Sequence, residues 1–116
     1  MTYQEFINNI LSTRGRFGCQ DKYHERHHIL PKCLGGTNDE KNLIDLYADE
    51  HYIAHELLAQ ENPHNKGLQY ALWTMSRCTK VQNNDRYVPT EEQYKNAREA
   101  FSKAMSGENN PLYGKR

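Results

Sequence analysis

Five of the six histidines lie between residues 24 and 55, and their spacing constrains how this part of the chain can fold. His27 and His28 are adjacent in a segment whose composition predicts a strand. His51 and His55 lie four residues apart in a predicted helix, so their rings project from one face, one turn apart. That spacing suits two ligands of one metal ion, with a third ligand from His27 or His28. Two histidines at this spacing are also often incidental, and that alternative stays open at this point.

The histidines favour some metals and some kinds of site over others. Imidazole suits zinc and nickel, and magnesium or manganese remain candidates if water completes the coordination shell. The sequence disfavours a zinc protease, because the H-E-x-x-H helix of those enzymes needs glutamate where this chain has Tyr52. A structural zinc site normally has four ligands, often cysteines, whereas three histidines are the candidates here. We therefore expect one divalent cation (Mg, Mn, Zn or Ni) with a coordination position open to water or substrate.

Composition predicts one small domain with a thin core. Hydrophobic residues are 36% of the 116 residues and the mean hydropathy is -1.02, so a metal or a partner is expected to reinforce the fold.

The sequence shows no apolar run long enough for a membrane span and no signal peptide, which predicts a soluble, cytoplasmic protein with no membrane partner. Three cysteines without a C-x-x-C pair indicate no disulfide framework. Residues 1–60 carry six Lys and Arg against nine Asp and Glu, and residues 61–116 carry nine against six, so binding of a polyanion would depend on the C-terminal half.

The order of predicted elements indicates an α+β fold. Thr2 and Glu5 form a capping box that begins the first helix, and Gly15 ends it. A second capping box, Thr90 with Gln93, begins the last helix. The predicted elements are a helix at 2–14, strands at 22–31 and 43–47, and helices at 48–60 (apolar stripe Ile53, Leu57 and Leu58), 65–77 and 90–106.

A longer pattern joins the histidines to the loop between the strands. It reads E-R-H-H-I-L-P from Glu25, then Gly35-Gly36, Asn42-Leu43 and E-H-x-x-x-H ending at His55. Asn42 lies fourteen positions after His28, His51 nine positions after Asn42, and His55 four positions after His51. Over residues 22–60 this pattern resembles the HNH family, the ββα-metal (His-Me finger) endonucleases, and in particular the short phage and intron-associated homing enzymes. The resemblance implies a ββα-metal core, a two-stranded hairpin and a helix, surrounded by additional helices.

The C-terminal residues carry a second resemblance. The run from Gly107 to Lys115 is similar to the G-x-x-N-P-x-Y-G-K signature of a nuclease-associated modular DNA-binding motif. Such motifs often occur in tandem in homing endonucleases, and one copy is present here. A Gly/Asn/Pro-rich disordered tail is the alternative interpretation.

The family pattern implies a role for each matched residue. His27, His51 and His55 would hold the cation, and His28 would act as the general base on the attacking water. Asn42 would brace the loop to the second strand, and Glu25 would have a supporting role. The expected reaction is metal-dependent hydrolysis of DNA phosphodiester bonds, leaving 5′-phosphate and 3′-hydroxyl ends. The residues expected to contact DNA are Arg98, Lys103, Asn110, Tyr113 and Lys115.

Two questions stay open in the sequence. Adjacent strand residues point to opposite faces, so His27 and His28 can serve one site only through a twist or bulge, or if the phosphate approaches the strand edge. A catalytically inactive DNA-binding module with a structural metal is the alternative function.

The predicted segments are residues 1–21 (helix and connection), 22–60 (nuclease core), 61–89 (supporting helix and linker) and 90–116 (helix and DNA-binding motif).

Overall fold

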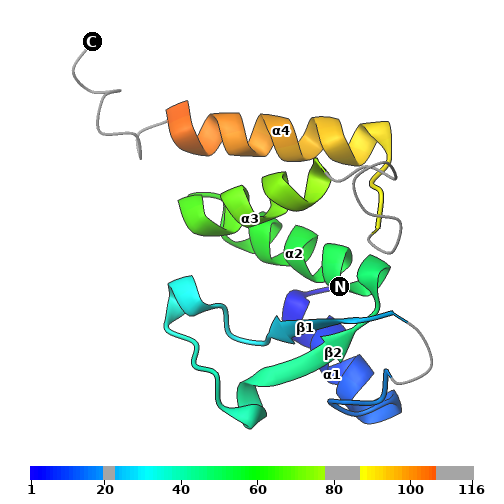
Figure 1. Cartoon of the computed structure of the whole chain (residues 1–116). Helices are drawn as coiled ribbons and strands as arrows, with labels where there is room; N and C mark the ends of the chain where they lie inside the picture. Colours follow the sequence, from blue (N-terminus) through cyan, green and yellow to red (C-terminus); the bar gives the residue numbers. More distant parts are fainter. Residues whose placement is uncertain (20–22, 78–86, 107–116) are drawn as a thin grey trace. The chain divides into compact units, whose positions relative to one another are not determined.

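The computed structural model describes residues 1–19, 23–77 and 87–106 (Figure 1). The fold is α+β, as predicted, with a two-stranded antiparallel hairpin and four α-helices in these residues. The chain divides into two compact units, Met1–Leu57 and Leu58–Arg116. Within the described ranges, none of the helices has the length and apolar character that a membrane span requires.

The first unit begins with helix α1 (Tyr3–Thr13), which starts and ends where the sequence predicts. Both hydrogen bonds of the Thr2–Glu5 capping box are present. After the helix, Gly15 adopts φ 83°, the left-handed conformation that favours glycine at the end of a helix. Tyr3, Ile7 and Ile10 form the buried face of α1, as the i, i+4, i+7 spacing predicts.

The hairpin pairs β1 (Glu25–His28) with β2 (Leu43–Leu46). The register runs without interruption from Glu25 opposite Leu46 to His28 opposite Leu43. The predicted first strand, residues 22–31, is too long. Strand pairing stops after His28 because the next backbone groups bond to Asn42 instead: Ile29 N–H donates to its carbonyl and Leu30 N–H to its side-chain oxygen.

Helix α2 (Ala48–Glu61) follows β2 directly. The residue before it is Tyr47, which lacks the hydroxyl or carboxylate side chain that usually caps a helix N-terminus. The helix nevertheless begins at Ala48, as predicted. Glu50 explains this, because its carboxylate accepts a hydrogen bond from Tyr47 N at 3.0 Å from inside the first turn. The same carboxylate accepts two hydrogen bonds from Arg14, at 2.6 and 3.0 Å, which connects the end of α1 to the start of α2.

The predicted apolar stripe of α2 is partly wrong. Ile53 is 39% exposed, whereas Tyr52, Ala54 and Leu58 are buried. Ile53 lies two residues from His51 and therefore on the opposite side of a helix with 3.6 residues per turn. The side of α2 that carries the histidines faces the protein interior, and Ile53 faces solvent.

The second unit contains the end of α2, α3 (Lys66–Ser76) and α4 (Glu91–Ser106), and α3 packs against α4. Trp73 stacks on Phe101 with ring centroids 6.0 Å apart and also contacts Tyr94 at 5.2 Å. The capping box of α4 is present, with Gln93 N donating to Thr90 Oγ1 at 3.1 Å.

Candidate metal centre

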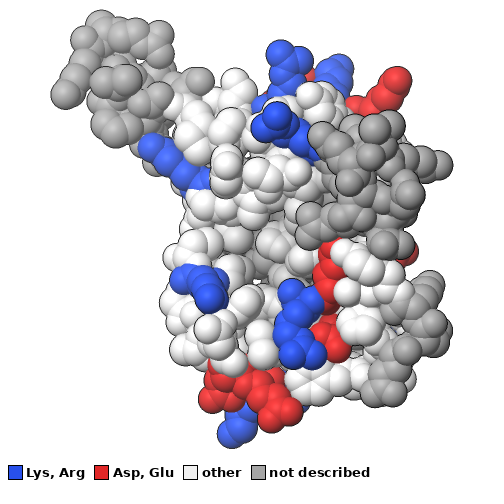
Figure 2. All heavy atoms as spheres, in the orientation of Figure 1, with Lys and Arg blue, Asp and Glu red and all other residues white. Residues whose placement is uncertain are grey.

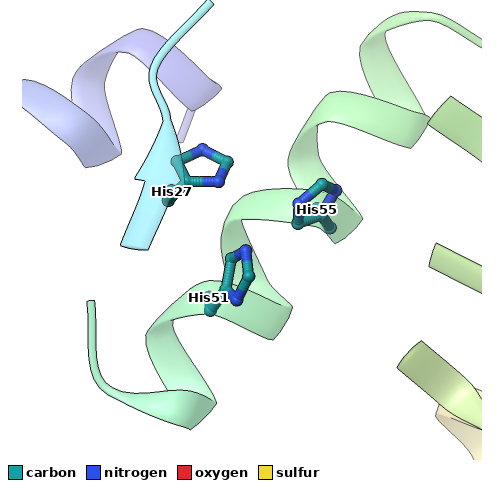
Figure 3. A group of neighbouring side chains, drawn as sticks. All are labelled: His27, His51 and His55. Atoms are coloured by element: carbon teal, nitrogen blue, oxygen red, sulfur yellow. The ribbon is translucent and has the colours of Figure 1, made fainter. Parts of the chain in front are cut away.

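Three imidazoles converge in the first unit. His27 comes from β1, and His51 and His55 come from α2 (Figure 3). Their ring centroids lie 4.9–5.2 Å apart, and one nitrogen of each ring lies within 4.8 Å of the others. The structure therefore brings together the three residues that the sequence nominated as metal ligands.

Local geometry explains why these side chains meet. Glu25 and His27 are two residues apart on β1 and so share one face of the hairpin. His51 and His55 are four residues apart on α2 and share one face of that helix. Glu25 and His27 face these α2 histidines, as the hydrogen bond between Glu25 Oε1 and His51 Nδ1 at 2.7 Å shows.

Each histidine of the cluster has a distinct polar environment. His27 is 3% exposed, and its Nε2 lies 2.7 Å from the Tyr3 hydroxyl. His51 uses Nδ1 to contact Glu25. His55 Nδ1 is buried and has no hydrogen-bond partner, which is unusual for a buried polar atom. A cation bound by the three rings would supply the missing partner.

Burial and repulsion between the rings favour the neutral form of His27 and His55. Burial lowers the pKa of His27 well below its usual value, and the neighbouring imidazoles His55, His51 and His28 lower it further. Burial, followed by repulsion from His51, lowers the pKa of His55 to about 4, against a smaller opposing effect of Glu25. Neutral imidazole is the form that binds metal ions, so the donor set fits a divalent cation.

His28 lies outside this cluster. The strand register is regular at His28, so its side chain points to the face opposite His27. Its Nε2 lies 2.8 Å from Asn38 Oδ1 in the loop between the strands. The described hairpin therefore contains no bulge that would turn both histidines to one face.

Asn42 fastens the loop between the strands. Its side-chain oxygen accepts from Leu30 N at 2.7 Å, and its side-chain nitrogen donates to Leu30 O at 3.0 Å and to Thr37 O at 2.8 Å. Gly36 lies against the same backbone, where a Cβ atom would be 1.7 Å from Leu30 O. The loop conformation thus depends on an amide at position 42 and the absence of a side chain at position 36.

The residues expected to contact DNA divide into two groups. Arg98 and Lys103 lie on α4, and together with Lys95, Glu99 and Ser102 they line a shallow surface depression. Figure 2 shows Lys and Arg side chains gathered over this helix. Asn110, Tyr113 and Lys115 lie outside the described residues.

Sequence reasoning missed two residues that contact the histidines. Tyr3 lies on the buried face of the first helix, but nothing in the sequence signals that its hydroxyl reaches His27. Asn38 belongs to the predicted loop, and its contact with His28 depends on the path of that loop.

Comparison with known proteins gives relatives from one phage. The chain is 38% identical over 111 residues to a protein named probable mobile endonuclease D of Enterobacteria phage T4, covering 91% of this chain and 42% of that protein. It is 41% identical over 63 residues to probable mobile endonuclease E of the same phage, covering 54% of this chain and 45% of that protein. The chain thus spans less than half the length of these curated relatives. No family model and no solved structure matches. The histidine cluster and these resemblances to probable mobile endonucleases are the findings from which a function can be argued.

Proposed function

We propose that this chain is a metal-dependent DNA endonuclease of the HNH type, of the homing or nicking kind. The observation that carries the proposal is the convergence of three imidazoles from β1 and α2 on one point, with a buried, unpartnered nitrogen on His55. The names of the phage relatives support the endonuclease class. The chain's H-H and H-x-x-x-H spacing supports the HNH type.

In this proposal His27, His51 and His55 hold one divalent cation. Zinc and nickel suit the nitrogen donors best, and magnesium or manganese could bind with water completing the shell. When bound, such a cation stabilises the negative charge that develops on the scissile phosphate and on its leaving oxygen. Three protein ligands leave at least one position for that phosphate.

His28 is the proposed general base. It would take a proton from water as the water oxygen attacks phosphorus and the 3′ oxygen leaves, giving 5′-phosphate and 3′-hydroxyl ends. Asn38 Oδ1 can only accept a hydrogen bond, so His28 Nε2 carries a proton and Nδ1 is the basic nitrogen. Because His27 and His28 face opposite sides at the end of β1, the phosphate would have to lie across that end of the strand.

Two further elements support this arrangement. Asn42 would hold the loop that carries Asn38 and so keep the proposed base in place. Arg98 and Lys103 on α4 would bind phosphates of the DNA, together with Asn110, Tyr113 and Lys115 of the C-terminal motif.

Incubation with supercoiled plasmid and a divalent cation, with and without chelator, tests the proposal. Conversion to nicked or linear DNA that the chelator abolishes is the expected result. His28→Ala should lower the rate by about 10²–10⁴-fold while metal binding persists. His51→Ala should lose metal binding and cleavage together. His64→Ala, an exposed histidine outside the cluster, is the matched control and should cut at the wild-type rate.

The alternative is an inactive DNA-binding module with a structural metal, and one observation favours it: His28 is not within the histidine cluster. That alternative predicts metal and DNA binding with intact plasmid at every cation tested. Wild-type cleavage by His28→Ala would reject the assignment of the base without rejecting the nuclease.

A further inference from the structure

Tyr3 places the first helix in contact with the histidine cluster. Its hydroxyl oxygen lies 2.7 Å from His27 Nε2 and 2.6 Å from the carbonyl oxygen of Ile29. The side chain is 6% exposed, and the tyrosine and histidine rings meet edge to face with centroids 6.0 Å apart. The three proposed metal ligands come from β1 and α2. This contact connects one of them, His27, to a third element, α1.

The two contacts of the hydroxyl determine which way its proton points. A carbonyl oxygen only accepts, so the tyrosine proton must go to Ile29; otherwise two oxygens would face each other at 2.6 Å with no proton between them. The hydroxyl then accepts from His27, whose Nε2 must carry a proton. In a neutral imidazole the other nitrogen, Nδ1, is left with the lone pair.

Glu25 has the same effect on His51 but selects the opposite nitrogen. A carboxylate accepts hydrogen bonds, so the 2.7 Å contact with Glu25 Oε1 requires a proton on His51 Nδ1; in the neutral ring this leaves the lone pair on Nε2. The Tyr23 hydroxyl donates to the other carboxylate oxygen and helps to fix its orientation. The carboxylate is 10% exposed, so little water competes for it.

We infer that Tyr3 and Glu25 are positioning residues of the proposed metal centre. They select opposite tautomers in two ligands, so that His27 presents Nδ1 and His51 presents Nε2 to the cation. His55, whose buried Nδ1 has no hydrogen-bond partner, completes the set. The inference rests on the proposed metal centre and does not depend on nuclease activity.

The chemistry of imidazole explains why both partners should matter. A neutral imidazole can carry its proton on either nitrogen, and each ring that holds its proton toward the cluster is lost as a ligand. Partners that orient metal-binding histidines typically contribute 10–100-fold to metal affinity. Removing either partner should therefore weaken metal binding by at least about 10-fold while the three ligands remain.

The first measurement is made on the metal-free wild-type protein. Long-range ¹H–¹⁵N correlation of the histidine rings identifies which nitrogen is protonated. We expect a proton on Nε2 of His27 and on Nδ1 of His51. The reverse pattern in either ring would overturn the inference, and this readout needs neither a variant nor activity.

The second measurement is Zn²⁺ affinity by competition with a chelating dye. Tyr3→Phe and Glu25→Ala should each weaken binding by about 10-fold or more. Glu25→Gln keeps an acceptor for His51 Nδ1 and should restore most of the affinity lost in Glu25→Ala. Ile7→Val, a core change on α1, and Tyr70→Phe, a hydroxyl removed from a 57% exposed tyrosine, are the matched controls and should bind Zn²⁺ like wild type.

The outcomes separate this inference from the proposed function. Wild-type affinity in Tyr3→Phe and Glu25→Ala would overturn the inference, and so would equal losses in Ile7→Val, since they would show a purely structural effect. A wild-type protein that binds no Zn²⁺ would overturn it together with the metal centre. The expected tautomers and affinities with no plasmid cleavage would support it while rejecting the nuclease.

Discussion

Acidification should destabilise the metal-free protein well before its carboxylates titrate. A histidine in the unfolded chain has a pKa of about 6.5, whereas burial lowers the pKa of His55 in the fold to about 4. Between these two values the unfolded chain binds more protons than the folded one. The contribution of His55 to the unfolding free energy is therefore fully present above about pH 6.5 and is lost as the pH falls toward 4.

The size of the loss follows from the two pKa values. At pH 5 the unfolded imidazole is almost fully protonated, whereas the folded His55 is about one-tenth protonated, which linkage converts to about 2 kcal/mol relative to pH 7. The pKa of His27 is also lowered by burial, so His27 adds a loss of the same sign. Ordinary carboxyl groups, with pKa values near about 4, remain mostly ionised at pH 5 and contribute little.

Urea unfolding in the presence of chelator, at pH 7, 6 and 5, measures this loss. His55→Gln removes one titrating group, so its unfolding free energy should fall by about 2 kcal/mol less than that of wild type over the same range. Ile7→Val, a core change that removes no titrating group, should keep the full wild-type pH dependence. A wild-type unfolding free energy that is equal at pH 7 and pH 5 would refute the reasoning.

Three further predictions concern the loop and the basic face of α4. Asn42→Ala removes three hydrogen bonds that the half-buried Asn42 side chain makes to an exposed loop, and should lower the unfolding free energy by about 1–2 kcal/mol in urea titrations; a loss below about 0.5 kcal/mol would contradict the brace. Gly36→Ala forces a Cβ to within 1.7 Å of Leu30 O, so thermal unfolding should show a clear destabilisation, and a wild-type midpoint would argue against this loop conformation. Replacing Arg98 and Lys103 by Gln should reduce the salt dependence of DNA binding by about two phosphate contacts, with metal binding unchanged; an unaltered salt slope would exclude this face of α4 from the DNA contact.

Local patterns in the sequence predicted the helices well because helix ends and faces depend on groups close together in the chain. The two capping boxes predicted the starts of α1 and α4, and Gly15 predicted the end of α1. The four-residue spacing of His51 and His55 placed both rings on one helix face, since helical geometry alone requires it. The fold class and the placement of His51 and His55 on one face therefore follow from local sequence patterns, whereas the choice of His27 as third ligand came from the resemblance to the HNH family.

Only the tertiary structure decided what surrounds those histidines, because the partners come from other elements. Strand alternation allowed either His27 or His28 to face α2, and the pairing of β1 with β2 selected His27. Tyr3 reaches His27 across 24 residues, and Glu25 reaches His51 across 26. No local propensity encodes contacts at that distance, and the same packing turned Ile53 outward although its apolar character predicted burial. The sequence pointed to these imidazoles as candidate ligands; packing decided which ring nitrogens contact other protein groups, Nε2 of His27 and Nδ1 of His51.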